Sequence, residues 1–160
     1  MKRNSTGFNI LTSVLIILLL TQCSASKQEK RSKADKVIGV AKSYMGTPYK
    51  WGGTSRSGMD CSGLVCTAYA SVGMKLPRTV VDQAKLGKSV EMGELRKGDL
   101  VIFRIKRKKQ GRVWHTGIVT EVVNKDKILF VHASSSKGVT VSNLMSDYYQ
   151  KWYKKSRRLL

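Results

Sequence analysis

The chain has 160 residues, and its 30 Lys and Arg side chains against 10 Asp and Glu give a formal net charge of +20. This length suits one compact domain with short additions rather than several domains. Its three cysteines, an odd number, exclude a small fold held together mainly by disulfide bonds.

The first 22 residues have the pattern of an export signal. Lys2 and Arg3 form a short positive start, and residues 10–20 form an apolar stretch. That stretch is too short for a membrane span, which needs about 20 apolar residues, but it suits the core of a signal peptide. We therefore expect residues 1–22 to lie outside the folded domain.

Cys23 ends a segment, LTQC, that is similar to the lipobox of bacterial lipoproteins, in which the cysteine is lipidated and becomes the mature N-terminus. Gln22 departs from that pattern, because Gly or Ala usually precedes the cysteine. Ordinary signal cleavage after Ala25 is the alternative, and it predicts a soluble secreted protein. By resemblance to lipoprotein sorting, Ser24 favours an outer-membrane lipoprotein that faces the wall. Residues 23–35 are then the lipidated cysteine and a flexible tether, because they are polar, rich in lysine and without apolar periodicity.

The remaining residues, 36–160, are expected to form the domain, with its helices first. Apolar residues at helical spacing predict one helix over residues 37–46. After glycine-rich turns, a second helix is expected to begin at Asp60, a residue type that caps helices, and to end at Gly73. A short helical piece at 81–86 follows.

The second half of the chain changes to the pattern of β-strands. The predicted strands cover residues 99–103, 116–123, 127–132, 139–141 and 156–160. Residues 147–155 are expected to form a helical turn packed on the sheet. Helices followed by antiparallel strands indicate an α+β fold rather than a doubly wound parallel sheet.

Cys61 is the candidate nucleophile. It stands in the first turn of the second helix, where unpaired backbone N–H groups and the positive end of the helix dipole favour thiolate over thiol. The alternative is that Cys61 is a small buried hydrophobic residue, as free cysteines usually are. Cys66 lies about 500° further around the same helix, so the two thiols point apart and cannot bridge.

The chain contains only two histidines, His115 and His132, and each borders a predicted strand. In the predicted hairpin, His115 starts one strand and His132 ends the next, so both are expected at the same edge of the sheet. A thiol nucleophile, an imidazole base and a polar residue that orients the base together form the catalytic triad of a cysteine enzyme. Glu121 and Asp99 are alternative orienting residues, and a structural histidine at a strand end is the alternative for His132.

The blocks PYKWGG, DCSGLV, LPRT, GDLVIF, HTGIV and FVHAS stand in an order that resembles the NlpC superfamily of bacterial cell-wall cysteine peptidases. The resemblance spans residues 34–160 and is strongest to the Spr/MepS branch of small lipoproteins that act on peptidoglycan. It implies a compact papain-like α+β unit whose N-terminal helices pack on a mainly antiparallel sheet.

The resemblance also implies roles for individual residues. Cys61 would be the nucleophile, His115 the general base and His132 the polar residue that orients the imidazole. Three further residues are expected at the substrate cleft: Tyr49, Ser62 and Arg78. No metal or other cofactor is expected, because the histidines and Cys61 lack the spacing of a zinc site.

The function implied is that of a peptidoglycan endopeptidase that cleaves stem-peptide amide bonds. The bond is either the D-alanyl–diaminopimelate crosslink or the D-γ-glutamyl–diaminopimelate bond. The expected partners are peptidoglycan and, through the lipid anchor, a membrane; the protein is expected to be a monomer that binds no nucleic acid. Cationic clusters at 106–109 and 154–158 suit a polyanionic envelope matrix or the solvated surface of a basic protein. The alternatives are a non-catalytic envelope-binding lipoprotein and a papain-like amidase or acyltransferase on another envelope substrate.

Overall fold

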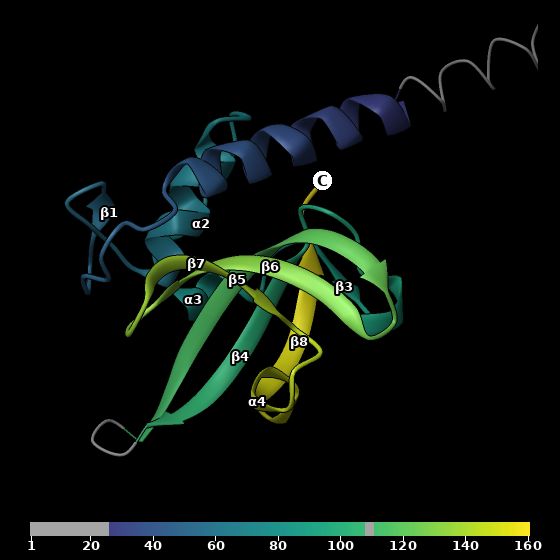
Figure 1. Cartoon of the computed structure of the whole chain (residues 1–160). Coiled ribbons are helices and arrows are strands. Elements are labelled where there is room, and N and C mark those ends of the chain that lie inside the picture. The colour runs from purple at the N-terminus through teal and green to yellow at the C-terminus, as the bar shows by residue number, and fades with distance from the viewer. Residues whose placement is uncertain (1–25, 108–110) are drawn as a thin grey trace, which may run out of the picture. The chain divides into compact units, whose positions relative to one another are not determined.

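The computed structural model describes residues 26–107 and 111–160, and the chain divides into two units, Met1–Ser32 and Lys33–Leu160 (Figure 1). The predicted signal peptide and Cys23 lie outside the described residues. No helix in the described part of the chain is long and apolar enough to cross a membrane. The elements that build the site all belong to the second unit.

The first helix covers residues 26–43 and begins well before the predicted start at residue 37. Residues 26–35, expected as part of a flexible tether, are helical instead. Seven of these ten residues are Lys, Gln, Glu, Arg or Ala, which are strong helix formers, so helix propensity extends a helix that packing stabilises further along. The packed part buries Val37, Ile38 and Ala41 in the core of the second unit.

The turn region after this helix contains a two-stranded sheet that the sequence does not predict. β1 (Thr54–Ser55) pairs antiparallel with β2 (Gly58–Met59). Gly53 permits this compact turn, because a Cβ atom there would lie 2.3 Å from the carbonyl oxygen of Gly58. This turn leads directly into α2 (Cys61–Ala70), so a tightly packed segment of backbone immediately precedes the first residue of that helix.

The later helices lie close to their predicted positions. α2 begins directly after Asp60, as predicted, and α3 (Val80–Gln83) is a single turn near the predicted piece at 81–86. α4 (Asp147–Trp152) lies within the predicted helical turn at 147–155.

A six-stranded antiparallel sheet, in the order β3-β8-β4-β5-β6-β7, forms the second half of the chain (Figure 1). Its strands are β3 (Lys88–Val90), β4 (Leu100–Arg107), β5 (Gly111–Asn124), β6 (Lys127–Ser134), β7 (Gly138–Asn143) and β8 (Tyr153–Arg158). A short 3-10 helix, η1 (Met92–Glu94), lies between β3 and β4. β3 is not predicted from the sequence, and β4 and β5 are longer than predicted.

The two faces of this sheet carry two separate hydrophobic clusters. Alternate residues of β4 show the division: Leu100 and Ile102 pack with the first helix and α2, whereas Val101 and Phe103 belong to the second cluster, to which α4 contributes. Helices packed on a mainly antiparallel sheet confirm the α+β prediction.

The strand boundaries correct one expectation about the histidines. Because β5 begins at Gly111, His115 lies inside a strand and not at its start. His132 likewise lies inside β6, which continues to Ser134. The two rings therefore meet across neighbouring strands and not at a shared strand edge.

Candidate active site

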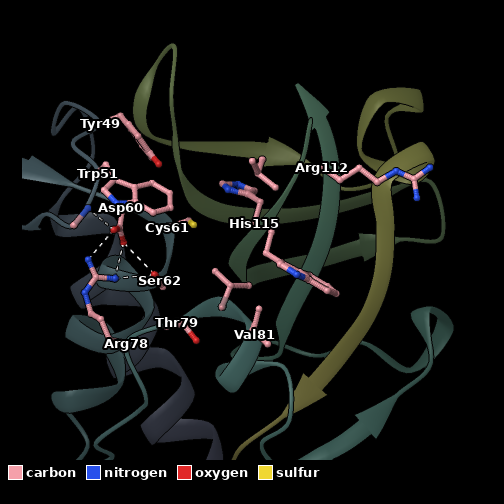
Figure 2. Close-up of a pocket in the computed structure, with 14 residues that line it drawn as sticks. Tyr49, Trp51, Asp60, Cys61, Ser62, Arg78, Thr79, Val81, Arg112 and His115 are labelled. Carbon is pink, nitrogen blue, oxygen red and sulfur yellow. Dashed lines mark hydrogen bonds and ion pairs between the residues drawn. The ribbon is translucent and has the colours of Figure 1, made fainter. Parts of the chain in front are cut away.

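A cavity of about 430 Å³ lies where the start of α2 faces β5 (Figure 2). The turn before α2 contributes one part of its wall, the segment that leads into α3 contributes another, and β5 closes the opposite side. Five of the six residues predicted for the catalytic centre and substrate cleft line this cavity: Tyr49, Cys61, Ser62, Arg78 and His115. The sixth, His132, lies behind His115.

Cys61 is the first residue of α2 and is only 7% exposed. Burial raises the pKa of its thiol to about 11; the backbone N–H groups of Thr116 and Ser62 oppose this shift, and the Asp60 carboxylate adds to it. The structure therefore corrects the expectation that the helix start favours thiolate, because desolvation outweighs the N–H groups. At neutral pH the thiol is protonated, so a base must remove its proton during attack.

Cys66 differs from Cys61 in its surroundings. Its thiol is directed toward the carbonyl oxygens of Leu76 and Pro77, at 3.6 and 3.4 Å. Both cysteines are free, as expected from their separation around the helix, and only Cys61 lines the cavity.

His115 and His132 are in direct contact. His115 Nε2 lies 2.9 Å from His132 Nδ1, and the two rings are nearly perpendicular, with centroids 5.0 Å apart. Figure 2 shows the Cys61 and His115 side chains extending into the same cavity from opposite walls. Because His115 Nε2 is within hydrogen-bond distance of His132, Nδ1 is the ring nitrogen that can accept the proton of the thiol.

Gly117 makes this histidine contact possible. Ile118 pairs with Val131 in the β5–β6 ladder, so Gly117 stands next to His132 across the strands. A Cβ atom at Gly117 would lie 2.5 Å from the Phe130 ring and 3.1 Å from His132 Cβ. The missing side chain leaves room for the diagonal approach of the His132 ring to His115.

His132 is buried, and two hydroxyl groups bond to the far side of its ring. Its Nε2 lies 3.0 Å from Ser142 Oγ and 3.1 Å from Tyr149 Oη. Burial lowers the pKa of His132 to about 4, so the ring is neutral at physiological pH. Sequence reasoning missed Ser142 and Tyr149, because neither lies in a motif and only the fold brings β7 and α4 beside β6.

The start of α2 is held by an ion pair. Arg78 donates to both carboxylate oxygens of Asp60, at 2.9 and 2.6 Å, and to Ser62 Oγ at 2.7 Å. The Asp60 carboxylate also accepts from the backbone N–H groups of Gly63 and Gly52, at 2.7 and 2.8 Å. Burial opposes ionisation of Asp60, but these hydrogen bonds outweigh it and lower its pKa. Arg78, which was expected at the substrate cleft, also joins the helix start to the turn before α3.

Two tryptophans that the sequence analysis did not single out line the cavity. Trp51 is 84% exposed, and Trp114 lies on β5 with the Arg104 guanidinium 5.1 Å from its ring. Together with Val80, Val81 and Val113, they make much of the cavity wall apolar. Across residues 26–107 and 111–160, no group of three or more His, Cys, Asp or Glu side chains is placed to hold a metal ion.

Comparison with protein families matches residues 46–158 to the NlpC/P60 family. The chain belongs to this family. The match covers the whole cavity, from Tyr49 through Arg78 to His115, and includes His132.

Named relatives support the same assignment. The chain is 38% identical over 128 residues to the probable endopeptidase NlpC homolog of Haemophilus influenzae, covering 79% of this chain and 63% of that protein. It is 41% identical over 118 residues to the murein DD-endopeptidase MepS/murein LD-carboxypeptidase of Escherichia coli, covering 73% and 58%. The chain thus spans about 60% of the length of these curated relatives.

The fold also resembles a solved structure, the peptidoglycan hydrolase RipB of Mycobacterium tuberculosis. The TM-score is 0.66 at 31% identity, over 83% of this chain and 67% of the other. This similarity confirms the compact α+β architecture expected from the sequence.

Proposed function

We propose that this NlpC/P60 protein is a peptidoglycan endopeptidase that works as a cysteine peptidase. One observation carries the proposal: Cys61 and His115 line the same cavity, and His115 Nε2 is held 2.9 Å from His132 Nδ1. A binding module has no use for a buried thiol beside an imidazole pair. The names of the relatives, which include a murein DD-endopeptidase and a peptidoglycan hydrolase, support peptidoglycan as the substrate.

In this mechanism Cys61 is the nucleophile and His115 the general base. Because the resting thiol is neutral, His115 Nδ1 takes its proton as Sγ attacks the carbonyl carbon. Backbone N–H groups at the start of α2 stabilise the oxyanion. The protonated His115 then transfers its proton to the leaving amine, and the acyl group stays on Sγ as a thioester. Water attacks this thioester with His115 again as base, which restores the thiol.

Three residues of the cavity wall are proposed to bind substrate: Tyr49, Ser62 and Arg78. Ser62 and Arg78 are already joined to Asp60, so they first shape the wall beside the thiol and then present what remains of their hydrogen-bonding capacity to the stem peptide. Tyr49 contributes an aromatic wall. His132 is proposed to act indirectly, by orienting the ring of His115.

The D-alanyl–diaminopimelate crosslink is the proposed bond, supported by the DD-endopeptidase among the relatives. The test is incubation of purified sacculi with the protein, followed by mass spectrometry of the released muropeptides. Loss of crosslinked dimers with new D-alanyl carboxyl termini is the expected result. Cleavage at the D-γ-glutamyl–diaminopimelate bond would move the protein to the other specificity. Binding without cleavage would favour a non-catalytic lipoprotein, and new acyl products would favour an amidase or acyltransferase.

The two cysteines of α2 supply a matched pair of variants. Cys61→Ala is expected to abolish turnover without loss of the fold, because it removes the attacking atom and little core packing. Cys66→Ser is expected to retain most of the activity, since its thiol lies outside the cavity. Equal loss in both variants, with both folded, would contradict the assignment of the nucleophile.

For localisation we propose an outer-membrane lipoprotein that is anchored through Cys23, works as a monomer on the wall and binds no nucleic acid. Cys23 lies outside the described residues, so this proposal is supported by its sequence context alone. Cys23→Ala is expected to shift the protein to the soluble envelope fraction while leaving activity on isolated sacculi unchanged. Labelling with a clickable fatty acid tests it directly. A mature N-terminus at Ser26 without label would show ordinary secretion.

A further inference from the structure

The far side of His132 carries a hydroxyl pair that the mechanism above does not use. Ser142 lies on β7 and Tyr149 on α4, and both lie within hydrogen-bond distance of His132 Nε2, at 3.0 and 3.1 Å. Tyr149 Oη also donates to Ser142 Oγ at 3.3 Å. The oxygen atoms of both groups thus converge on one ring nitrogen, and a continuous hydrogen-bonded chain runs from the cavity through His115 and His132 to α4.

The position of Tyr149 is set by packing. Its ring lies 5.4 Å from that of Phe103 and 4.8 Å from that of Phe130, with a near-perpendicular approach to Phe130. The Phe130 ring in turn stacks on His132, with centroids 4.8 Å apart. These contacts place the hydroxyl group and also mean that a phenylalanine at position 149 would keep the packing and remove only the oxygen.

The chemistry of His115 requires one particular tautomer of His132. To take a proton on Nδ1, neutral His115 must carry its own hydrogen on Nε2, and that hydrogen points at His132 Nδ1. His132 Nδ1 must then be an acceptor, so the single hydrogen of its neutral ring lies on Nε2. The same arrangement is needed once His115 becomes an imidazolium, because its Nε2–H still donates to His132.

The opposite tautomer blocks the reaction. If His132 carried its hydrogen on Nδ1, it would donate to His115 Nε2, and the hydrogen of His115 would move to Nδ1. His115 would then present a donor to the Cys61 thiol and accept no proton. Selection between the two forms depends on what faces His132 Nε2, since that nitrogen is a donor in one and an acceptor in the other.

We propose that Tyr149 and Ser142 are positioning residues that hold His132 in the tautomer with its hydrogen on Nε2, and thereby keep His115 competent as a base. The Tyr149 hydroxyl hydrogen is directed to Ser142, so the Tyr149 oxygen offers a lone pair to His132 Nε2–H, and Ser142 Oγ lies within reach to accept from the same N–H. The inference rests on the proposed function for its catalytic meaning, but the tautomer itself is a property of the free protein.

The variants that test this proposal are Tyr149→Phe, Ser142→Ala and the double variant, each made in the full chain. Tyr148→Phe is the matched control, because it removes a tyrosine hydroxyl from the neighbouring residue of α4 that is 54% exposed. Urea denaturation of every variant separates loss of the fold from loss of tautomer control.

The first readout is the ring-nitrogen NMR spectrum of histidine-labelled protein without substrate, which distinguishes a nitrogen that carries hydrogen from one that does not. Only two histidines contribute, so the spectrum can be assigned with His115→Gln. The wild type and Tyr148→Phe are expected to show His132 protonated on Nε2. The double variant is expected to populate the form protonated on Nδ1.

The second readout is turnover of peptidoglycan fragments. Each single variant is expected to lower kcat by about 10-fold and the double variant by about 100-fold or more, with little change in KM, because a wrong tautomer disables the base and leaves substrate binding intact. Tyr148→Phe should match the wild type. A wild-type His132 protonated on Nδ1, or a folded double variant with unchanged tautomer and kcat, would overturn the proposal. If the wild type failed to cleave peptidoglycan, the NMR result would still decide the tautomer.

Discussion

The Cys61 thiol combines two opposed local effects. Its place at the start of α2 gives it backbone N–H neighbours, whereas its burial removes the water that would solvate a thiolate. Burial prevails and raises the pKa to about 11. The thiol therefore does not ionise by itself, and the neighbouring His115 has to remove its proton for the sulfur to attack.

The rate of alkylation reports the ionisation of the Cys61 thiol directly. We expect the rate of iodoacetamide modification of the Cys61 peptide to rise with pH throughout the range from about 7 to 10, since the reactive thiolate is a small fraction below its pKa. Peptide-level mass spectrometry follows Cys61 and Cys66 in one sample. A fast, pH-independent rate for Cys61 below pH 7 would show instead a resting thiolate–imidazolium pair.

His132 makes stability depend on acid pH. Its pKa falls from 6.5 to about 4 on folding, so between these values the unfolded chain binds more protons than the folded one. The contribution of the neutral ring to the free energy of unfolding is complete above pH 6.5 and is lost as pH falls toward 4. We expect His132→Asn to flatten the pH dependence of the free energy of unfolding in this window, by at most about 1.4 kcal/mol per pH unit. Urea denaturation at pH 7 and pH 5 measures the slope, and an unchanged slope would contradict this account.

At the scale of single elements, the start of α2 depends on Asp60. This carboxylate caps the helix through Gly63 N–H, receives Gly52 N–H from the preceding turn and pairs with Arg78. It therefore joins three segments that the cavity needs in fixed positions. The sequence shows a helix cap here, but it does not show the ion pair to a residue 18 positions away.

Removing that carboxylate should destabilise the domain. Asp60→Ala is expected to lower the free energy of unfolding by about 2–4 kcal/mol, because it deletes the cap and leaves the Arg78 guanidinium without its carboxylate partner. Asp82→Ala is the control: it removes an exposed acidic residue from the first turn of α3 and should have a much smaller effect. Chemical denaturation compares the two variants. Similar losses would show that Asp60 is only an ordinary surface cap.

At the scale of the whole molecule, positive charge dominates. Removal of residues 1–22 takes away only Lys2 and Arg3 from the charged groups, so the net charge falls from +20 to +18. Part of this charge lies beside the cavity: Arg104 pairs with Trp114 across the β4–β5 ladder, and exposed Lys106 pairs with Arg112. Trp114 and Arg112 both line the cavity, so the positively charged residues of β4 and β5 lie next to the cavity wall.

Salt should therefore weaken binding to intact sacculi more than to small soluble muropeptides, because ions screen exposed charges beyond about 8–10 Å. Pelleting with sacculi at increasing salt concentration measures the effect. Replacing Arg104 and Lys106 by Gln should reduce the salt dependence more than the same replacement of Lys125 and Lys127 in the β5–β6 hairpin. Pelleting that does not change with salt would exclude an electrostatic contribution.

The order of helices and strands was predictable, because apolar periodicity, caps and glycine turns are local signals. The strand ends near His115 were not, since the basic residues between Arg104 and Arg112 mask the alternation of buried Ile105 and half-buried Val113. β3 was missed because a three-residue strand shows too little pattern, and the helix over 26–35 was missed because its polar composition suits a tether as well as a helix.

The family, the α+β class and the identity of the candidate catalytic thiol, imidazole and neighbouring residues could be read from the sequence alone, because these depend on residue types in a fixed order. How these groups act on one another depends on the tertiary structure. The protonated state of Cys61 follows from burial, and the approach of His132 to His115 follows from register and a missing side chain at Gly117. The hydroxyls of Ser142 and Tyr149 reach His132 because β6, β7 and α4 pack together. Burial, register and packing are long-range properties, and no local pattern of residues records them.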